Sequence, residues 1–239
     1  MIKPNTVHGA SIGILMLETR FPRIPGDPGN PESWPFPVRY HVVRGATASA
    51  AIGSNSQALL QVFIDAAADL VSQGVDGITT SCGFLSLMQR ELKAAISVPV
   101  AASSLMQIPA VQSLLPAGRR VGVLTIDSHA LTGAHLHAAG APMDTPVMGT
   151  ENGKEFTRVI LNDERDMDIA LCRSDNLQAA QCLVARYPDV GAIVLECTNM
   201  VPYAADIQAV TGLPVYSIHT FINWFQSGLA PRRFALDPH

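Results

Sequence analysis

The clearest shortage in this sequence is of charged side chains. Asp, Glu, Lys and Arg together make up 15% of the 239 residues, whereas about 25% is usual for a soluble domain. The formal net charge is only −4, so the chain lacks the strongly basic surface with which proteins hold nucleic acids or anionic membranes. We therefore expect no nucleic-acid or membrane partner, and we expect a second copy to cover part of the surface in a homo-oligomer.

Long apolar runs and a cysteine framework are also missing. No run approaches the roughly 18 consecutive apolar residues that cross a bilayer, and the apolar run 12–17 is too short for a secretion signal. Four cysteines are too few for a disulfide framework, and none has the Cys-x-x-Cys or Cys/His spacing of a metal site. The sequence predicts a cytoplasmic protein with free thiols and without a metal.

Short apolar runs alternate with longer segments of helical periodicity, as is typical of an α/β fold with parallel strands. The predicted strands are 11–17, 77–80, 98–102, 121–125, 192–195 and 214–217. The predicted helices are 56–73, 85–95, 128–139, 177–187 and 201–211.

An internal repeat organises the chain. The segment 74–82 (GVDGITTSC) aligns with 189–197 (DVGAIVLEC), and at the same spacing 98–100 (VPV) aligns with 213–215 (LPV). The repeat predicts two like lobes: residues 1–104 with 213–239 in the first, and residues 105–212 in the second. Such lobes usually face each other across a ligand cleft at the carboxyl ends of their strands.

The two halves differ most in the proline-rich segment 18–47, which belongs to the first lobe. This segment leaves the carboxyl end of the first strand, where α/β folds keep their active sites, so one interpretation is a lid or rim over the cleft. The other interpretation is a surface excursion packed on the sheet edge, with 38–43 as a short added strand.

Cys82 and Cys197 each follow a buried strand directly, where a helix begins. The helix dipole and free backbone N–H groups favour an anion there, so the thiols should ionise more easily. A thiolate and a thiol on opposite sides of a cleft would remove and return the proton next to a carboxylate, given donors for the enediolate. A lone cysteine ending a strand is more often a small core residue, but two at repeat positions favour catalysis. The candidate donors are Thr79, Thr80, Ser81, Gly83, Phe84, Thr198 and Asn199.

The elements GITTSCGF (77–84) and AIVLECTNM (192–200), together with the two-lobe repeat, resemble the aspartate/glutamate/hydantoin racemase superfamily. This group comprises cofactor-independent amino-acid racemases, hydantoin racemases, arylmalonate decarboxylases and maleate cis-trans isomerases. The resemblance implies two flavodoxin-like (Rossmann-like) lobes with parallel sheets, related by a pseudo-twofold axis, with the active site between them. It also implies that Cys82 and Cys197 are the acid/base pair, that Thr198 and Asn199 hold the substrate, and that no cofactor such as pyridoxal phosphate is used.

The sequence departs from the racemase pattern at two places. Gly83-Phe84 follow the first cysteine, where racemases usually have Asn-Thr, so plain aspartate or glutamate is not the expected substrate. Glu18-Thr19-Arg20 stands in place of Asp-Ser-Gly. Arg20 or Arg23 would clamp a second carboxylate; the alternative is a loop ion pair with Glu18 or Asp27.

Two further polar residues adjoin the predicted cleft. His219 ends the last predicted strand, where it would orient a thiol or bind substrate; the alternative is a hydrogen-bonded histidine at a helix start. Glu196 directly precedes Cys197. If the strand continues through it, its side chain lies on the opposite face from the cysteine, in a structural role; the alternative is that it tunes the thiol through the backbone turn.

These observations favour an isomerase: a cofactor-independent racemase or epimerase that acts on a small amino acid or amino-acid derivative by proton transfer between two cysteines. A first alternative is a maleate-isomerase-like or decarboxylase-like enzyme of the same superfamily. In the isomerase version of that alternative, Cys82 attacks an unsaturated acid as a nucleophile and Cys197 donates a proton. A second alternative is a non-catalytic protein that binds a small acid.

Overall fold

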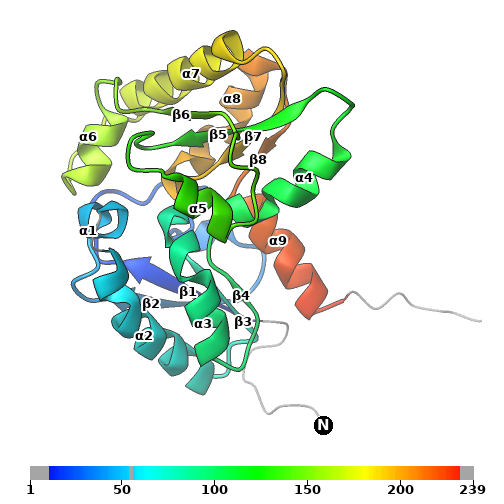
Figure 1. The fold of residues 1–239 in the computed structure, drawn as a ribbon. Helices are drawn as coiled ribbons and strands as arrows, with labels where there is room; N and C mark the ends of the chain where they lie inside the picture. Colours follow the sequence, from blue (N-terminus) through cyan, green and yellow to red (C-terminus); the bar gives the residue numbers. More distant parts are fainter. Residues whose placement is uncertain (1–10, 54–55, 232–239) are drawn as a thin grey trace, which may run out of the picture.

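The computed structural model describes residues 11–53 and 56–231. It contains two four-stranded sheets, one above the other in Figure 1, with helices packed beside each. All the strand pairs are parallel. The first sheet has the order β2-β1-β3-β4, with β1 Ile12–Leu17, β2 Val38–Val43, β3 Gly77–Thr80 and β4 Val100–Ala101. The second has the order β6-β5-β7-β8, with β5 Arg120–Thr125, β6 Val147–Gly149, β7 Val190–Leu195 and β8 Val215–Tyr216.

The two sheets share one strand order when each is numbered from its own first strand. Strands β3 and β7, which precede the two cysteines, occupy equivalent positions beside the first strand of their sheets. This arrangement confirms the pair of like α/β lobes that the internal repeat predicts. It also places the carboxyl ends of β3 and β7 in corresponding places in the two lobes.

Helices and short 3-10 turns connect the strands. The α-helices are α1 Ala48–Ile52, α2 Leu60–Ser72, α3 Gln89–Ala95, α4 Ile108–Leu114, α5 Gly133–Ala138, α6 Phe156–Leu161, α7 Ile169–Arg186, α8 Ala204–Thr211 and α9 Ile218–Leu229. The 3-10 turns are η1 Pro31–Ser33, η2 Ser56–Leu59, η3 Gly83–Met88, η4 Ser104–Gln107 and η5 Thr198–Tyr203. Turns η3 and η5 directly follow the two cysteines, so a tight 3-10 turn replaces the first part of each predicted helix.

Some element boundaries differ from the predicted ones. Helix α5 begins five residues into its predicted range, because Thr132 forms a capping box with the backbone and side chain of His135. Helix α7 begins earlier than predicted, because the Asp168 carboxylate accepts hydrogen bonds from the first backbone N–H groups. Strand β6 has no predicted counterpart, because its only apolar side chains, Val147 and Met148, are half-buried and Gly149 follows them directly, so they form no apolar run.

The core is continuous between the lobes. One cluster of buried side chains includes Leu15 and Ile78 from the first sheet and Leu124 and Leu195 from the second. A smaller cluster covers the other face of β1, where α9 packs against the first sheet. The central strands are therefore buried on both faces, which explains their unbroken apolar sequences.

The sheet membership of β8 corrects the lobe division drawn from the sequence. That division assigned residues 213–239 to the first lobe, but Val215 pairs with Ile193 of β7 in the second sheet. The chain returns to the first sheet only with α9, which begins at Ile218. Residues 1–10 and 232–239 of that division lie outside the described residues.

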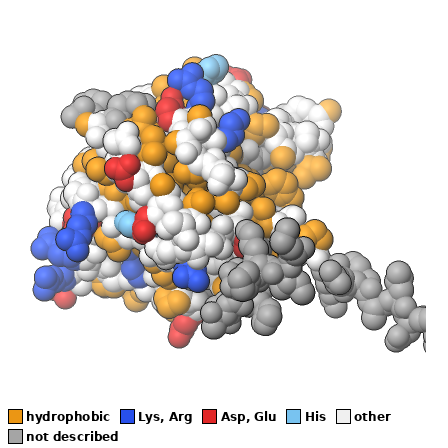
Figure 2. Space-filling model, turned by 90° about the horizontal axis from the view of Figure 1, so that it is seen from below, with side chains coloured by type: hydrophobic (Ala, Val, Ile, Leu, Met, Phe, Trp, Pro, Cys, Tyr) orange, Lys and Arg blue, Asp and Glu red, His pale blue; other side chains and the backbone are white. Residues whose placement is uncertain are grey.

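The surface agrees with the low charge of the sequence. On the face in Figure 2, hydrophobic side chains cover broad areas between separate charged groups. Leu114, Met143 and Trp224 are the most exposed of the large hydrophobic side chains in the described part of the chain. No helix within residues 11–53 and 56–231 has the length and apolar character that crossing a membrane requires. The predicted homo-oligomer remains a prediction.

Candidate active site

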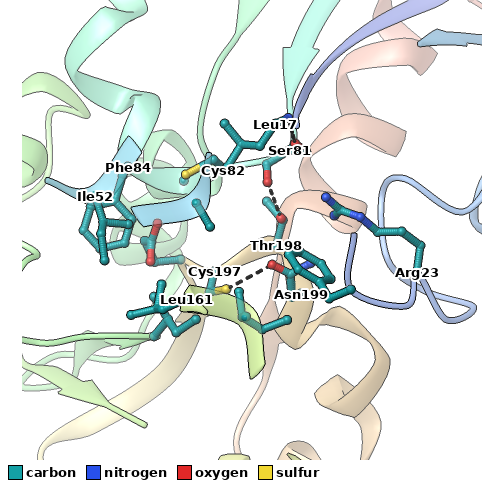
Figure 3. A pocket seen from close by; sticks show the side chains of 16 residues that line it. Leu17, Arg23, Ile52, Ser81, Cys82, Phe84, Leu161, Cys197, Thr198 and Asn199 are labelled. Carbon is teal, nitrogen blue, oxygen red and sulfur yellow. Dashed lines mark hydrogen bonds between the residues drawn. The ribbon is translucent and has the colours of Figure 1, made fainter. Parts of the chain in front are cut away.

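The two cysteines at the ends of β3 and β7 line one pocket between the sheets. Cys82 precedes η3, Cys197 precedes η5, and both are buried. Figure 3 shows the two sulfur atoms on opposite walls of this pocket. The structure thus brings together the residues that the repeat singled out, although they are separated by more than a hundred positions in the chain.

The pocket is small and mostly apolar. Its free volume is about 20 Å³, which is room for about one water molecule, so a larger ligand would fit only if the walls moved apart. Both lobes contribute apolar walls: Leu17, Phe21, Ala48, Ile52, Phe84, Ile126, Ile160 and Leu161.

Burial opposes ionisation of both thiols. Desolvation raises the pKa of Cys82 to about 12, and backbone hydrogen bonds from Phe84 and Leu85 oppose this rise only in part. Burial and the Glu196 carboxyl together raise the pKa of Cys197 well above its usual value. The expectation of easily ionised thiols is therefore wrong for the closed pocket, because loss of water outweighs the amides of a short turn.

Glu196 also lines the pocket, so the purely structural interpretation of this residue is wrong and the alternative, that it acts on the thiol, fits better. Strand β7 ends at Leu195, so strand alternation no longer decides where the next side chain points. Glu196 is fully buried; its Oε2 accepts a 2.7 Å hydrogen bond from Thr125 Oγ1. Its Oε1 has no hydrogen-bond partner among the described residues. Burial raises the pKa of this carboxyl to about 8.

This carboxyl gives a pH prediction. The folded protein keeps the Glu196 proton up to about pH 8, whereas the unfolded chain releases it near pH 4.5. Between these values the unfolded state binds fewer protons, so the contribution of Glu196 to stability is greatest below pH 4.5 and declines as the pH rises towards 8. Relative to Glu196→Gln, we expect the free energy of unfolding of the wild type to fall by about 3 kcal/mol between about pH 5 and pH 8.

Urea denaturation of both proteins across this range measures the difference. The exposed Glu32 supplies the matched control, because Glu32→Gln removes the same charge without a buried carboxyl. A wild type and a Glu196→Gln variant whose stabilities change in parallel with pH would contradict the prediction.

Four other predicted site residues line the pocket near the cysteines. Gly83 and Phe84 follow Cys82 in η3, and Thr198 and Ser81 join the lobes through a 2.7 Å bond from the threonine hydroxyl to the Ser81 carbonyl oxygen (Figure 3). Thr80 lies behind the wall, where its hydroxyl donates to the carbonyl oxygen of Ala102 at 2.7 Å. The structure thus gives Thr80 a supporting position outside the pocket lining.

Asn199 connects the second cysteine to the proline-rich segment. Its Oδ1 lies 3.7 Å from Cys197 Sγ and accepts the thiol hydrogen, while its Nδ2 donates to Asp27 Oδ2 at 2.5 Å. Asp27 is almost fully buried and also pairs with Arg23 Nη1 at 3.0 Å. Sequence reasoning considered Asp27 only as an ion-pair partner for an arginine, and the structure adds the link to the cysteine.

The two candidate arginines have different surroundings. Arg23 lines the pocket and forms the ion pair with Asp27 that the sequence left as an alternative. The Arg20 side chain is 61% exposed and pairs with Asp163 of the second lobe at 2.9 Å, outside the pocket lining. Arg23 is therefore the arginine that could contact a ligand in the pocket, whereas Arg20 forms an ion pair between the two lobes.

His219 lies outside the pocket lining. Its Nε2 is 2.9 Å from the carbonyl oxygen of Ser33, and its ring stacks on Trp34. These contacts hold η1, within the proline-rich segment, against α9. The structure therefore gives His219 the hydrogen-bonded position at a helix start that the sequence left as the alternative.

The proline-rich segment is part of the site. Phe21 and Arg23 come from this segment and line the pocket, and residues 38–43 form the edge strand β2. Both interpretations of residues 18–47 thus apply, each to a different part. The first part is a rim of the pocket, and the last part extends the sheet.

Comparison with solved structures identifies the fold first. A mutant of arylmalonate decarboxylase aligns with 96% of this chain and 97% of its own, with a TM-score of 0.62 and 17% identity. The aspartate racemase of Picrophilus torridus aligns with 95% of this chain and 96% of its own, with a TM-score of 0.57 and 14% identity. The fold is that of the aspartate/glutamate/hydantoin racemase superfamily. No family model matches the chain.

Sequence comparison narrows this class. Dimethylsulfoniopropionate lyase of Durusdinium sp. clade D is 31% identical over 243 residues, which span 98% of this chain and 80% of that protein. Dimethylsulfoniopropionate lyase 7 of Emiliania huxleyi is 32% identical over 230 residues, 92% of this chain and 67% of that protein. The chain belongs to the dimethylsulfoniopropionate lyase family. These relatives are lyases, as decarboxylases are, and they favour the decarboxylase-like alternative over the racemase that the sequence analysis preferred.

Proposed function

We propose that this protein is a lyase that eliminates dimethyl sulfide from dimethylsulfoniopropionate. The observation that carries the proposal is the pair of buried cysteines lining one closed pocket, in a chain that belongs to this lyase family. Elimination begins with the step for which the cysteine pair was singled out, removal of a proton from the carbon next to a carboxylate.

The reaction departs from racemisation once this proton has been removed. In dimethylsulfoniopropionate the next carbon carries a dimethylsulfonium group. A cysteine thiolate takes the α-proton, the electron pair forms the carbon–carbon double bond, and the carbon–sulfur bond breaks. The products are acrylate and neutral dimethyl sulfide, and the proton stays on the thiol until solvent removes it. A racemase-type site therefore becomes a lyase site when the substrate supplies a leaving group.

Cys82 is the better candidate for the base. Two backbone amides, those of Phe84 and Leu85, donate to its sulfur and stabilise a thiolate. Cys197 receives one such bond, from Asn199, and points its own hydrogen at the side-chain oxygen of that residue. A bound sulfonium places a positive charge in the pocket, and this charge offsets the desolvation that raises the thiol pKa.

Arg23 is the candidate for holding the carboxylate. Figure 3 shows its guanidinium near Asn199, on the side of the pocket away from Phe84 and Ile52. One Nη1 hydrogen is directed to Asp27 and one Nη2 hydrogen to Thr19. A guanidinium has five N–H donors, so others remain for a carboxylate. Its charge also favours the enediolate as negative charge builds up on the substrate carboxylate.

Incubation with dimethylsulfoniopropionate tests the function. We expect equal amounts of acrylate, followed by proton NMR, and dimethyl sulfide, followed by gas chromatography. A parallel panel of amino acids, hydantoins and maleate in D₂O serves as the comparison, and there we expect no loss of α-proton signal and no isomerisation. Exchange of the α-proton or isomerisation in that panel, with no acrylate from dimethylsulfoniopropionate, would contradict the lyase proposal and favour a racemase or isomerase.

A further inference from the structure

We propose that Glu196 binds the positively charged substituent of the substrate, so that the pocket selects small carboxylates that carry a fully alkylated onium group. This inference rests on the proposed function and deepens it, because it identifies the part of the protein that separates a sulfonium substrate from an uncharged or amino-substituted acid. Glu196 precedes Cys197 but takes no part in the proton transfer proposed above.

The geometry of the carboxyl group is the first argument. Glu196 is fully buried in the pocket wall, Thr125 holds its Oε2, and its Oε1 has no hydrogen-bond partner among the described residues. A buried polar atom without a partner costs free energy that the fold must supply. Such an atom in the lining of a pocket is explained when a ligand becomes its partner.

Gly83 supplies the room for this group. A Cβ atom at position 83 would lie 2.3 Å from Glu196 Oε1 and also 2.3 Å from the Glu196 carbonyl oxygen. Glycine is therefore required at this position by the close approach of Glu196 and not by an unusual backbone conformation. The contact also places the Oε1 atom beside the turn that carries Cys82 and Phe84.

Charge separation along the pocket is the second argument. Among the described residues that line the pocket, Glu196 has the one carboxylate and Arg23 has the one cationic side chain. Glu196 adjoins Gly83, next to Phe84, whereas Arg23 lies on the opposite side in Figure 3. A zwitterion with its carboxylate at Arg23 and its cation at Glu196 then spans the pocket, with the α-carbon between the cysteines.

The apolar surroundings indicate which cation fits. Phe84, Ile52 and Ile126 offer no hydrogen-bond acceptor on their side chains. A primary ammonium group has three N–H donors and would leave some of them unpaired there, which is costly in a buried site. A sulfonium or quaternary ammonium group carries only alkyl groups, so it needs the charge of Glu196 but no further acceptors.

Binding of the onium group also has a proton signature. Burial raises the pKa of Glu196 to about 8, so about 0.9 of these carboxyls carry a proton in the empty site at pH 7. A cation next to the carboxyl favours its ionised form. Binding at pH 7 should therefore release close to one proton, and binding of an uncharged analogue should release none.

Calorimetry with two unreactive ligands of the same shape tests the inference. The probes are 3-(trimethylammonio)propanoate and its carbon isostere 4,4-dimethylpentanoate, titrated at pH 7 into the intact protein in two buffers of different ionisation enthalpy. We expect the ammonium compound to bind at least about tenfold more tightly, with the proton release given above. Glu196→Gln should bring the ratio of the two affinities close to one and abolish the proton release, whereas the exposed control Glu32→Gln should change neither.

Several results would overturn the inference. They are equal affinity of the wild type for the two probes, no binding of the ammonium compound at about 10 mM, or a preference that survives Glu196→Gln. If Glu196→Gln does not fold, the wild-type affinity ratio and proton count still decide. If the protein turns over dimethylsulfoniopropionate but does not prefer the ammonium probe, the inference about Glu196 is rejected and the proposed function stands. A Glu196-dependent preference without turnover supports the cation site and rejects the proposed function.

Discussion

Cys82→Ala is expected to lower acrylate formation by about a thousandfold or more. General-base catalysis by a positioned group contributes roughly 10²–10⁴-fold. The second thiol lies on the opposite wall of the pocket, so in the proposed complex it would face the other side of the substrate. Cys82 is buried in the pocket wall, so alanine removes the sulfur atom without exposing the core. Initial rates at saturating dimethylsulfoniopropionate measure this loss, and circular dichroism checks the fold.

Two other cysteine variants make this result specific. Cys182 is exposed on α7, so Cys182→Ala is the matched control and should keep full activity. Cys197→Ala should cost less than Cys82→Ala, because elimination requires a base but not a second proton donor. More than a tenth of wild-type activity in Cys82→Ala would show that the base lies elsewhere, and a larger loss in Cys197→Ala would exchange the two roles.

Gly83→Ala is expected to reduce both stability and activity. The added methyl group would lie 2.3 Å from the Glu196 carbonyl oxygen, and a backbone atom cannot move aside as the end of a flexible side chain can. Overpacking of this kind costs about 1–3 kcal/mol. The turn that carries Cys82 must shift, and a displacement near 1 Å at reacting groups lowers rates by about a hundredfold.

Gly228→Ala is the matched control for this substitution. A Cβ at Gly228 meets no atom within 4 Å, and the residue lies within α9, where alanine favours the helix by up to about 1 kcal/mol over glycine. Thermal unfolding and acrylate formation, measured for both variants, give the comparison. If Gly83→Ala has the same unfolding temperature and the same rate of acrylate formation as the wild type, Glu196 does not approach this turn so closely.

Most strands of the two sheets were predictable from the sequence, because parallel strands that are buried on both faces consist of short runs of apolar residues. The repeat around Cys82 and Cys197 fixed equivalent positions for both thiols, since corresponding strands of like lobes end in corresponding places. The resemblance to the racemase superfamily rested on the same residues, and the structure has the fold that this resemblance implies. Strand β6 was missed because its two apolar residues, Val147 and Met148, are half-buried and form no apolar run.

The finer features of the site depend on details that patterns do not encode. The direction of the Glu196 side chain does not follow from strand alternation, because β7 ends at Leu195, directly before it. Arg20 and Arg23 are three positions apart and look equivalent in the sequence, yet only the folded loop separates an ion pair between lobes from a pocket residue. The leaving group is a property of the substrate, so identical thiols in a sequence fit both racemisation and elimination.

The small free volume of the pocket bears on how a substrate would enter and a product would leave. Phe21 from one lobe and Leu161 from the other both wall a space that holds about one water molecule. The Asp163 carboxylate accepts hydrogen bonds from the backbone N–H groups of Arg20 and Phe21 beside this wall. In the proposed reaction the pocket would therefore have to open once for the substrate to enter and again for acrylate to leave. A pocket closed between these openings would keep bulk water from the substrate, so that the proposed elimination would outrun protonation of the carbanion by solvent.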